Sequence, residues 1–299
     1  MTTALERLRM TWDSESQADW PVTELLATLS LGAYSSPEDA EVAFHSQGFT
    51  STKPVTTGCQ IGYIVSVEDA TVIVFRGTDD PGDWFANLDV RPDSDVHGRI
   101  HRGFNHAYES LQSQIIGLLT DTPPANLWIT GHSLGGALAV ICAYDLIHYQ
   151  TLDVCGVMTF GQPMVASKKA ANYLDDLLRG RYVRFVNGRD IVTRIPPFHA
   201  HCGSLVRFVG DSIQRGTAKH LLVGAADQDE PSRVDDELAP LTEEEFRQAQ
   251  AEVRAESEAC DRAPDEPNVV KGNIPCLRDH GMELYLEKVR ALVGETGNL

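Results

Sequence analysis

The sequence lacks paired cysteines and is poor in basic residues. It contains no C-x-x-C pair, and its six cysteines stand apart, at positions 59, 142, 155, 202, 260 and 276. Unpaired spacing of this kind does not predict a zinc cluster. Lys and Arg number 25 against 43 Asp and Glu, which gives a formal net charge of −18. Because a phosphate-binding face needs clustered cations, this acidity disfavours nucleic acid or an anionic membrane surface as a partner.

Long apolar runs are also missing. No stretch approaches the ~18–20 apolar residues that cross a bilayer, and the first ten residues lack the apolar core of a secretory signal. We therefore expect no transmembrane segment and a cytoplasmic location, with secretion by a leaderless route or after processing as the alternative. Cys260 and Cys276 flank an acidic segment and could form a disulfide. Because the cytoplasm is reducing, we expect free thiols instead. Cys142 and Cys155 lie in apolar stretches and are expected to be buried.

Residues 128–138 contain the most informative motif. They read Trp-Ile-Thr-Gly-His-Ser-Leu-Gly-Gly-Ala-Leu, so that Gly131 to Gly135 form G-x-S-x-G. Apolar residues predict a strand before this motif and an amphipathic helix, 137–149, after it. The tight turn between them strains Ser133 and presents its hydroxyl above the sheet, while the flanking glycines prevent a clash. This pattern indicates a nucleophile elbow; the alternative is a serine that only opens the helix.

The remaining pattern alternates strands with helices, apart from a polar connection at 76–103. Such alternation is typical of the α/β class, with a mainly parallel sheet covered on both faces. We expect one domain, 1–299, because α/β enzymes of this length commonly form one. The expected strands are 60–66, 71–75, 127–129, 156–160, 182–186 and 205–209, and the other expected helices are 21–34, 104–119, 167–178 and 282–292.

An acidic insertion is predicted at about 211–275. Residues 227–266 hold Asp or Glu at fifteen positions and Arg at four. Thr242 and Glu245 fit a capping box, which predicts an exposed helix over 243–258. The segment is too polar to bury a core of its own, so it is interpreted as an insertion that either forms a solvated surface or caps a binding site. Its acidic groups lack the spacing of a calcium loop.

A serine hydroxyl needs a histidine to accept its proton and a carboxylate to orient that histidine. In α/β-hydrolase folds the order along the chain is Ser, Asp, His. Asp190 is the favoured acid because it follows the strand 182–186 on a loop leaving the sheet, although a turn aspartate that caps backbone amides is the alternative. Four histidines follow. His280, on a loop before the last helix, is favoured as the base.

The other three histidines receive structural interpretations. We expect His199 and His201 to hold the following strand through hydrogen bonds, and His220 to be a core or loop residue. Ester chemistry also needs donors for an oxyanion. The backbone N–H of Leu134, directly after the serine, is one candidate, and Thr78, which follows the strand 71–75, is the other.

Six motifs together resemble the class 3 (fungal-type) lipase family. They are Phe75-Arg-Gly-Thr78, Asp83-Trp84, His101-Arg-Gly-Phe104, Gly131-His-Ser-Leu-Gly-Gly136, Phe160-Gly-Gln-Pro163 and Asn187-Gly-Arg-Asp-Ile-Val192 with Pro196-Pro197. The resemblance runs from about residue 25 to 210 and resumes at His280. It implies an α/β-hydrolase fold and a triad of Ser133, Asp190 and His280, with Thr78 and Leu134 forming the oxyanion hole.

The same resemblance implies a lid at about 79–88, with Trp84, Phe85 and Leu88 as its apolar residues. It implies hydrolysis of acylglycerols or other fatty-acyl esters through an acyl-serine, with no metal or cofactor and with a lipid or small ester as the partner. Phospholipase A1, feruloyl esterase and thioesterase activities use the same triad and are alternatives. A catalytically inactive scaffold is the alternative from another class.

Overall fold

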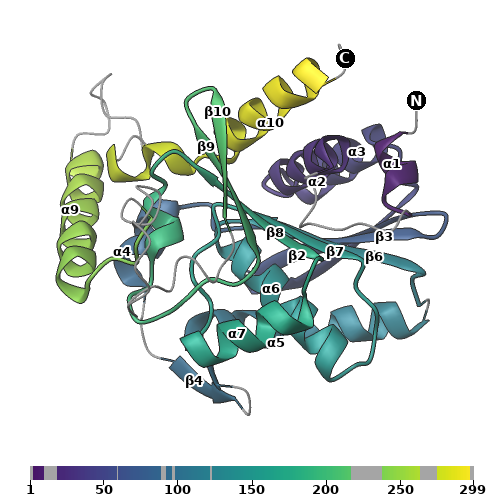
Figure 1. Cartoon of the computed structure of the whole chain (residues 1–299), viewed down its shortest axis with the longest axis horizontal. Coiled ribbons are helices and arrows are strands. Elements are labelled where there is room, and N and C mark those ends of the chain that lie inside the picture. Colours follow the sequence, from purple (N-terminus) through teal and green to yellow (C-terminus); the bar gives the residue numbers. More distant parts are fainter. Residues whose placement is uncertain are drawn as a thin grey trace, which may run out of the picture.

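The computed structural model describes residues 3–9, 19–58, 60–88, 92–95, 98–121, 123–216, 238–262 and 275–296. Within them, an eight-stranded sheet has the order β1-β2-β3-β6-β7-β8-β9-β10 (Figure 1). The strands are β1 Ser51–Thr57, β2 Gln60–Val67, β3 Ala70–Phe75, β6 Asn126–His132, β7 Gly156–Phe160, β8 Tyr182–Asn187, β9 Ser204–Val209 and β10 Ser212–Gly216. Neighbours from β3 to β9 pair in parallel, and both edges pair antiparallel. The mainly parallel sheet is confirmed, and β1 and β10 are additions to it.

Helices cover both faces of this sheet (Figure 1). One face packs against α1 Ala4–Arg7, α2 Trp20–Gly32, α3 Pro37–Ser46 and α10 Met282–Thr296, and the other against α5 Arg102–Asp121, α6 Leu134–His148 and α7 Lys168–Leu177. Alternate residues of β3 enter the two cores, Val72 and Val74 on one side, Ile73 and Phe75 on the other. A strand buried on both faces has no polar alternation, which explains its continuous apolar run. No helix within the described ranges is both long and apolar enough to cross a bilayer.

The polar connection expected over 76–103 contains regular structure. It holds helix α4 Pro81–Asn87 and a hairpin of β4 Pro92–Asp95 and β5 Gly98–His101. Asp80 caps α4, because its carboxylate accepts a 2.8 Å hydrogen bond from the Asp83 N–H, and Pro81 occupies the first turn. An acceptor followed by proline is a helix-start pattern. The helix was not predicted because the segment as a whole is polar.

The predicted start of the acidic insertion was wrong. Residues 212–216 form β10, which pairs with β9 in the main sheet, so the insertion begins after Gly216. The predicted helix is present as α9 Glu243–Arg262, with its capping box formed: Glu245 accepts from the Thr242 N–H at 2.8 Å, and the Glu245 N–H donates to Thr242 Oγ1 at 3.2 Å.

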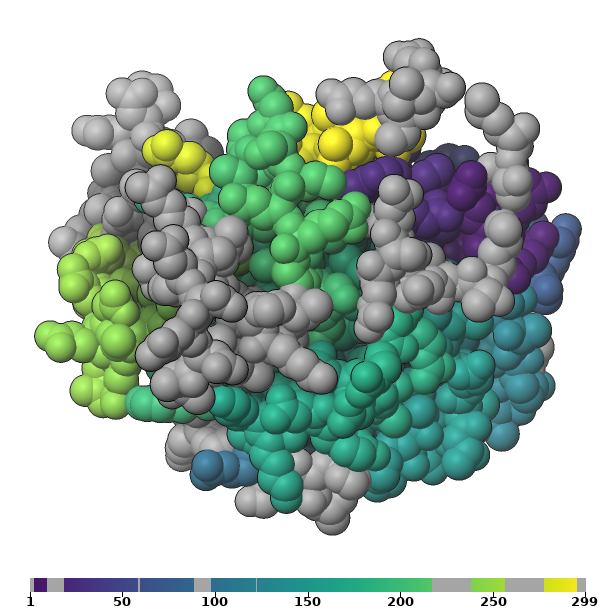
Figure 2. All heavy atoms as spheres, viewed as in Figure 1, coloured from purple at the N-terminus to yellow at the C-terminus, as the bar shows by residue number. Residues whose placement is uncertain are grey.

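The expectation that this helix is exposed is wrong for one of its faces. One face of α9 is buried, through Phe246, Ala249 and Val253, in an apolar cluster that includes Phe85 and Ala86 of α4. The opposite face is acidic and exposed, and Figure 2 shows α9 as an outer layer at the side of the molecule. The insertion therefore packs on the domain through a helix with two different faces.

Several expectations lie outside the described residues. These are His220, the acidic groups over 227–237, and the side chains of Cys260 and Cys276. Cys142 is a buried free thiol, as expected, whereas Cys155 is only partly buried.

Candidate active site

The G-x-S-x-G motif forms the sharp turn that its glycines predict. Strand β6 ends at His132 and helix α6 begins at Leu134, and Ser133 between them has φ 57° and ψ −129°. A positive φ is strained for a residue with a side chain. A Cβ on Gly135 would lie 2.3 Å from the Phe75 carbonyl oxygen, and one on Gly131 would lie 2.4 Å from Gly135. The strand, turn and helix approach this closely only because both positions are glycine.

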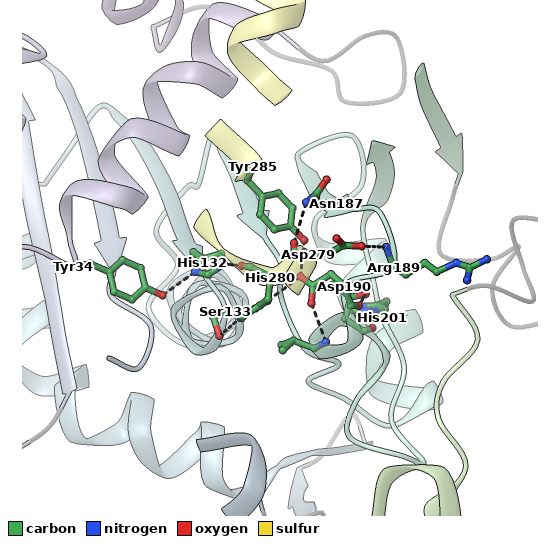
Figure 3. Close-up of polar contacts among 12 residues, drawn as sticks. Tyr34, His132, Ser133, Asn187, Arg189, Asp190, His201, Asp279, His280 and Tyr285 are labelled. Carbon is green, nitrogen blue, oxygen red and sulfur yellow. Dashed lines mark hydrogen bonds and ion pairs between the residues drawn. The ribbon is translucent and has the colours of Figure 1, made fainter. Parts of the chain in front are cut away.

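The three predicted triad residues meet at one end of the sheet (Figure 3). His280 Nε2 lies 2.8 Å from Ser133 Oγ, and His280 Nδ1 lies 2.8 Å from Asp190 Oδ2. The residues come from three separate elements: the elbow, the loop after β8, and the 3₁₀ helix η3 Pro275–His280. Ser133 and Asp190 are fully buried and His280 is 2 % exposed.

The Asp190 carboxylate accepts three hydrogen bonds, which fix the orientation of the imidazole. Oδ2 accepts from His280 and from the Tyr285 hydroxyl at 2.7 Å, and Oδ1 accepts from the Val192 N–H at 2.9 Å. Asp190 therefore also caps a short 3₁₀ helix, η1 Ile191–Arg194. An ionised carboxylate only accepts, so the proton of a neutral His280 resides on Nδ1. Nε2 is then left with a lone pair that accepts the Ser133 hydroxyl proton.

Three aromatic residues whose roles the sequence did not reveal hold this arrangement. Tyr285 belongs to α10, and burial followed by the Asp190 charge raises its pKa well above the usual value, so it remains a donor. His132 donates from Nε2 to the His280 carbonyl at 2.7 Å, and its Nδ1 accepts from the Tyr34 hydroxyl at 2.8 Å. Burial, with a further contribution from His280, lowers the pKa of His132, so this residue is neutral.

His199 and His201 lie outside the triad. His199 Nδ1 donates to the Pro197 carbonyl at 3.0 Å, and His201 Nε2 donates to the Thr193 carbonyl at 2.6 Å. The expectation that they hold the following strand was wrong, because both bond the preceding loop. The bond from His201 supports η1, the turn that begins at Asp190.

The predicted oxyanion residues lie beside the elbow. Strand β3 pairs with β6 so that Phe75 is opposite Gly131, and the loop carrying Thr78 leaves β3 at that point. A Cβ on Gly77 would lie 2.8 Å from the His132 carbonyl oxygen, which shows how closely this loop approaches the motif. Leu134 opens α6, where backbone N–H groups are available to an anion. The roles of Thr78 and Leu134 stay predictions.

The lid candidates Trp84, Phe85 and Leu88 lie on or beside α4 and face inward. Trp84 stacks on Phe104 with ring centroids 6.2 Å apart, and Phe85 packs on Phe246 of α9 at 5.7 Å. Gln250 donates from Nε2 to the carbonyls of Phe85 at 3.0 Å and of Ala86 and Leu88 at 3.3 Å.

Arg254 also donates to the Ala86 carbonyl. The last carbonyls of a helix have no partner within that helix. Side chains of α9 therefore satisfy the open end of α4.

Because three histidines are buried, we predict that acid destabilises the fold. Burial lowers the pKa of His132, His199 and His201 in the folded chain, whereas in the unfolded chain they titrate near ~6.5. Below about pH 6.5 the unfolded state therefore binds more protons than the folded state. The free energy of unfolding has its full value above that pH and falls as the pH decreases. Three such groups account for up to about 4 kcal/mol between pH 7.5 and 5.5.

Urea denaturation followed by circular dichroism at these two pH values measures the effect. We expect a lower midpoint at pH 5.5. His45→Gln, a change at a half-exposed histidine, should leave the difference between the midpoints intact. Equal midpoints at the two pH values would contradict the prediction.

Part of the chain is similar to known lipases. Residues 72–200 match the family model "Lipase (class 3)". The chain is 38% identical over 143 residues to a lipase of Rhizomucor miehei, covering 44% of this chain and 38% of that protein. It is 34% identical over 103 residues to a secreted mono- and diacylglycerol lipase, LIP4, of Malassezia restricta, covering 33% of this chain and 34% of that one.

A solved structure is similar over a larger share of the chain. It is a triacylglycerol lipase whose catalytic centre is a serine protease triad, with a TM-score of 0.55 and 27% identity, covering 65% of this chain and 83% of that one. The sequence alignments, in contrast, span little more than a third of the two curated relatives.

Proposed function

Since the chain carries the class 3 lipase region in residues 72–200 and an α/β-hydrolase fold, we propose that it is a serine hydrolase of carboxylic esters. The observation that carries this proposal is the pair of 2.8 Å hydrogen bonds that join Ser133, His280 and Asp190. A serine activated in this way is the usual nucleophile of acyl transfer.

The proposed reaction has two halves. Ser133 Oγ attacks the ester carbonyl as His280 Nε2 takes its proton, and the Asp190 carboxylate stabilises the resulting imidazolium. The backbone N–H of Leu134 and Thr78 stabilise the oxyanion, and each donor of this kind contributes roughly 3–4 kcal/mol. His280 then protonates the leaving alcohol. In the second half His280 takes a proton from water as the water oxygen attacks the acyl-serine, and it returns that proton to Ser133 Oγ as the carboxylic acid leaves.

Acylglycerols are the substrates that we propose first. The relatives support this choice, since one acts on mono- and diacylglycerols and a similar solved structure is a triacylglycerol lipase. Shorter, soluble esters are a further class, because the lid segment contains Asp79, Asp80 and Asp83 and offers few outward apolar groups to an oil surface.

A fluorophosphonate probe and a series of p-nitrophenyl esters test the proposal. We expect one label per folded chain, located at Ser133 and absent in Ser133→Ala, and hydrolysis across some part of the range from acetate to palmitate. A folded chain with an unmodified Ser133 would instead favour an inactive scaffold. A sharp rise in rate on emulsified substrate would identify a lipase rather than an esterase.

We further propose that α9 is a cap that holds α4 closed over the site. The support is the Phe85–Phe246 contact, together with the bonds that Gln250 and Arg254 donate to the end of α4. In this state Ser133 has no exposed surface. Displacement of α4 alone would leave its last carbonyls without these donors and would separate two apolar faces.

The double variant Gln250→Ala and Arg254→Ala tests the cap. These hydrogen bonds contribute about 1 kcal/mol each, so their loss should raise the open population and increase kcat/KM on p-nitrophenyl butyrate by roughly 5- to 30-fold. The matched control is Arg247→Ala, on the exposed face of the same helix, where Arg247 pairs with Glu243. A folded double variant whose kcat/KM equals that of the control would argue against a cap.

A further inference from the structure

Asp279, the residue before His280, reaches the loop that carries Asp190. Its Oδ2 accepts a hydrogen bond from the Arg189 N–H at 2.8 Å, and its backbone carbonyl accepts one from Asn187 Nδ2 at 3.0 Å. Figure 3 shows these residues beside the triad. The first bond joins the direct neighbours of the proposed base and the proposed acid, and the second reaches Asn187, at the end of β8 and three residues before Asp190.

Gly188 makes this approach possible. Its φ is +50°, and a Cβ at this position would lie 2.3 Å from Asp279 Oδ2 and 3.0 Å from Asp279 Cγ. The carboxylate therefore lies directly against the glycine backbone, where any larger residue would displace it. Gly188 is itself anchored to β9, because its N–H donates to the Phe208 carbonyl at 2.9 Å and its carbonyl accepts from Arg207 Nε at 2.8 Å. The loop that receives Asp279 is thus held by the sheet.

Precise placement matters at this point because the base and the acid are far apart in sequence. The backbone of His280 is fixed on the Ser133 side by the bond from His132 to its carbonyl. Asp279 supplies a second attachment on the Asp190 side. A catalytic group displaced by about 1 Å loses roughly a hundredfold in rate, so both attachments bear on the reaction.

We propose that Asp279 is a positioning residue that sets the geometry of the Asp190–His280 hydrogen bond. It acts through the backbone of its neighbour and touches no reacting atom. This inference rests on the proposed hydrolase function. The essential property is a hydrogen-bond acceptor at Oδ2, not the negative charge.

Asp279→Ala and Asp279→Asn separate these two properties. Asparagine keeps an acceptor oxygen of the same shape, so Asp279→Asn should retain kcat on p-nitrophenyl butyrate within about threefold. Alanine removes the acceptor, and kcat should fall roughly 10- to 100-fold with KM unchanged. A looser bond to Asp190 stabilises the imidazolium less, so the acid limb of the kcat/KM profile should move to lower pH in Asp279→Ala. A residue that only supports the fold would lower the melting temperature without moving that limb.

Two results would overturn the inference. The first is a folded Asp279→Ala with the native kcat and acid limb. The second is an Asp279→Asn as slow as Asp279→Ala, which would assign the effect to charge. If Asp279→Ala does not fold, Asn187→Ala is the second test, because it removes the hydrogen bond to the Asp279 carbonyl. It should shift kcat and the acid limb in the same direction. Native values of kcat and of the acid limb in Asn187→Ala would also overturn the inference.

Failure of the proposed function is distinguishable from failure of this inference. If the wild-type chain neither hydrolyses esters nor reacts with a fluorophosphonate, the hydrolase itself is refuted. If the wild type reacts, the labelling rate of Ser133 gives a second measure of base positioning. It should fall in Asp279→Ala in parallel with kcat.

Discussion

His280→Ala is expected to reduce kcat/KM for p-nitrophenyl esters by about 10⁴- to 10⁶-fold, the loss seen when a triad base is removed. The imidazole is the side chain that accepts from Ser133 Oγ, at 2.8 Å, among the described residues. Without it the hydroxyl in the first half of the reaction, and the water in the second half, have no acceptor for their protons. The backbone carbonyl of residue 280 remains available to His132, so the fold should persist.

His201→Ala is the comparison that makes the assignment secure. His201 is also buried and lies near the Asp190 loop, but its Nε2 bonds the Thr193 carbonyl and not the triad. We expect its replacement to act through η1 alone and to cost at most about tenfold. Circular dichroism of both variants checks that each is folded. Activity that survives His280→Ala but disappears in His201→Ala would transfer the role of base to His201.

Asp190→Asn should lower kcat by about 10⁴-fold without loss of structure. The side chain keeps its size, and its oxygen can continue to accept from the Val192 N–H, as Oδ1 does now at 2.9 Å. The amide group then faces His280 Nδ1 and donates to it. This reverses the tautomer, so that Nε2 carries the proton and can no longer accept one from Ser133.

Steady-state kinetics at pH 8, where carboxylates are ionised, measures this loss. KM should change little, because Asp190 is linked to Ser133 through His280 and not directly. The Tyr285 hydroxyl also meets the new amide group, which adds a steric and polar mismatch to the same position. Retention of more than a tenth of the native kcat by a folded Asp190→Asn would contradict the triad.

Sequence reasoning predicted the site residues that lie in a recognisable local sequence pattern. The glycines around Ser133 mark a turn, and Asp190 follows a strand that the apolar pattern had already predicted. Tyr34, His132, Tyr285 and Asp279 were missed. Their contacts join the segment after α2 with β6, and β8 and its following loop with η3 and α10. Such pairings depend on how distant segments pack rather than on nearby residues.

The acidic insertion shows a different limit. Phe246, Ala249 and Val253 are spaced by three and four residues, which is the spacing of one helical face. That pattern was present, but the acidic average of the segment led to the expectation of an exposed helix. In α4, likewise, the residues that are buried, such as Phe85, find their partner on α9, more than 150 positions away. The cellular location stays a prediction.

The order of the triad along the chain has a consequence for biosynthesis. Every strand of the main sheet, with Ser133 and Asp190, precedes residue 217, whereas the histidine follows the insertion. Because N-terminal parts fold first as a chain emerges from the ribosome, the nascent protein can assemble its sheet while the hydroxyl is still inert. Chemical competence arrives only with η3, which carries His280 and is translated after the sheet and the insertion.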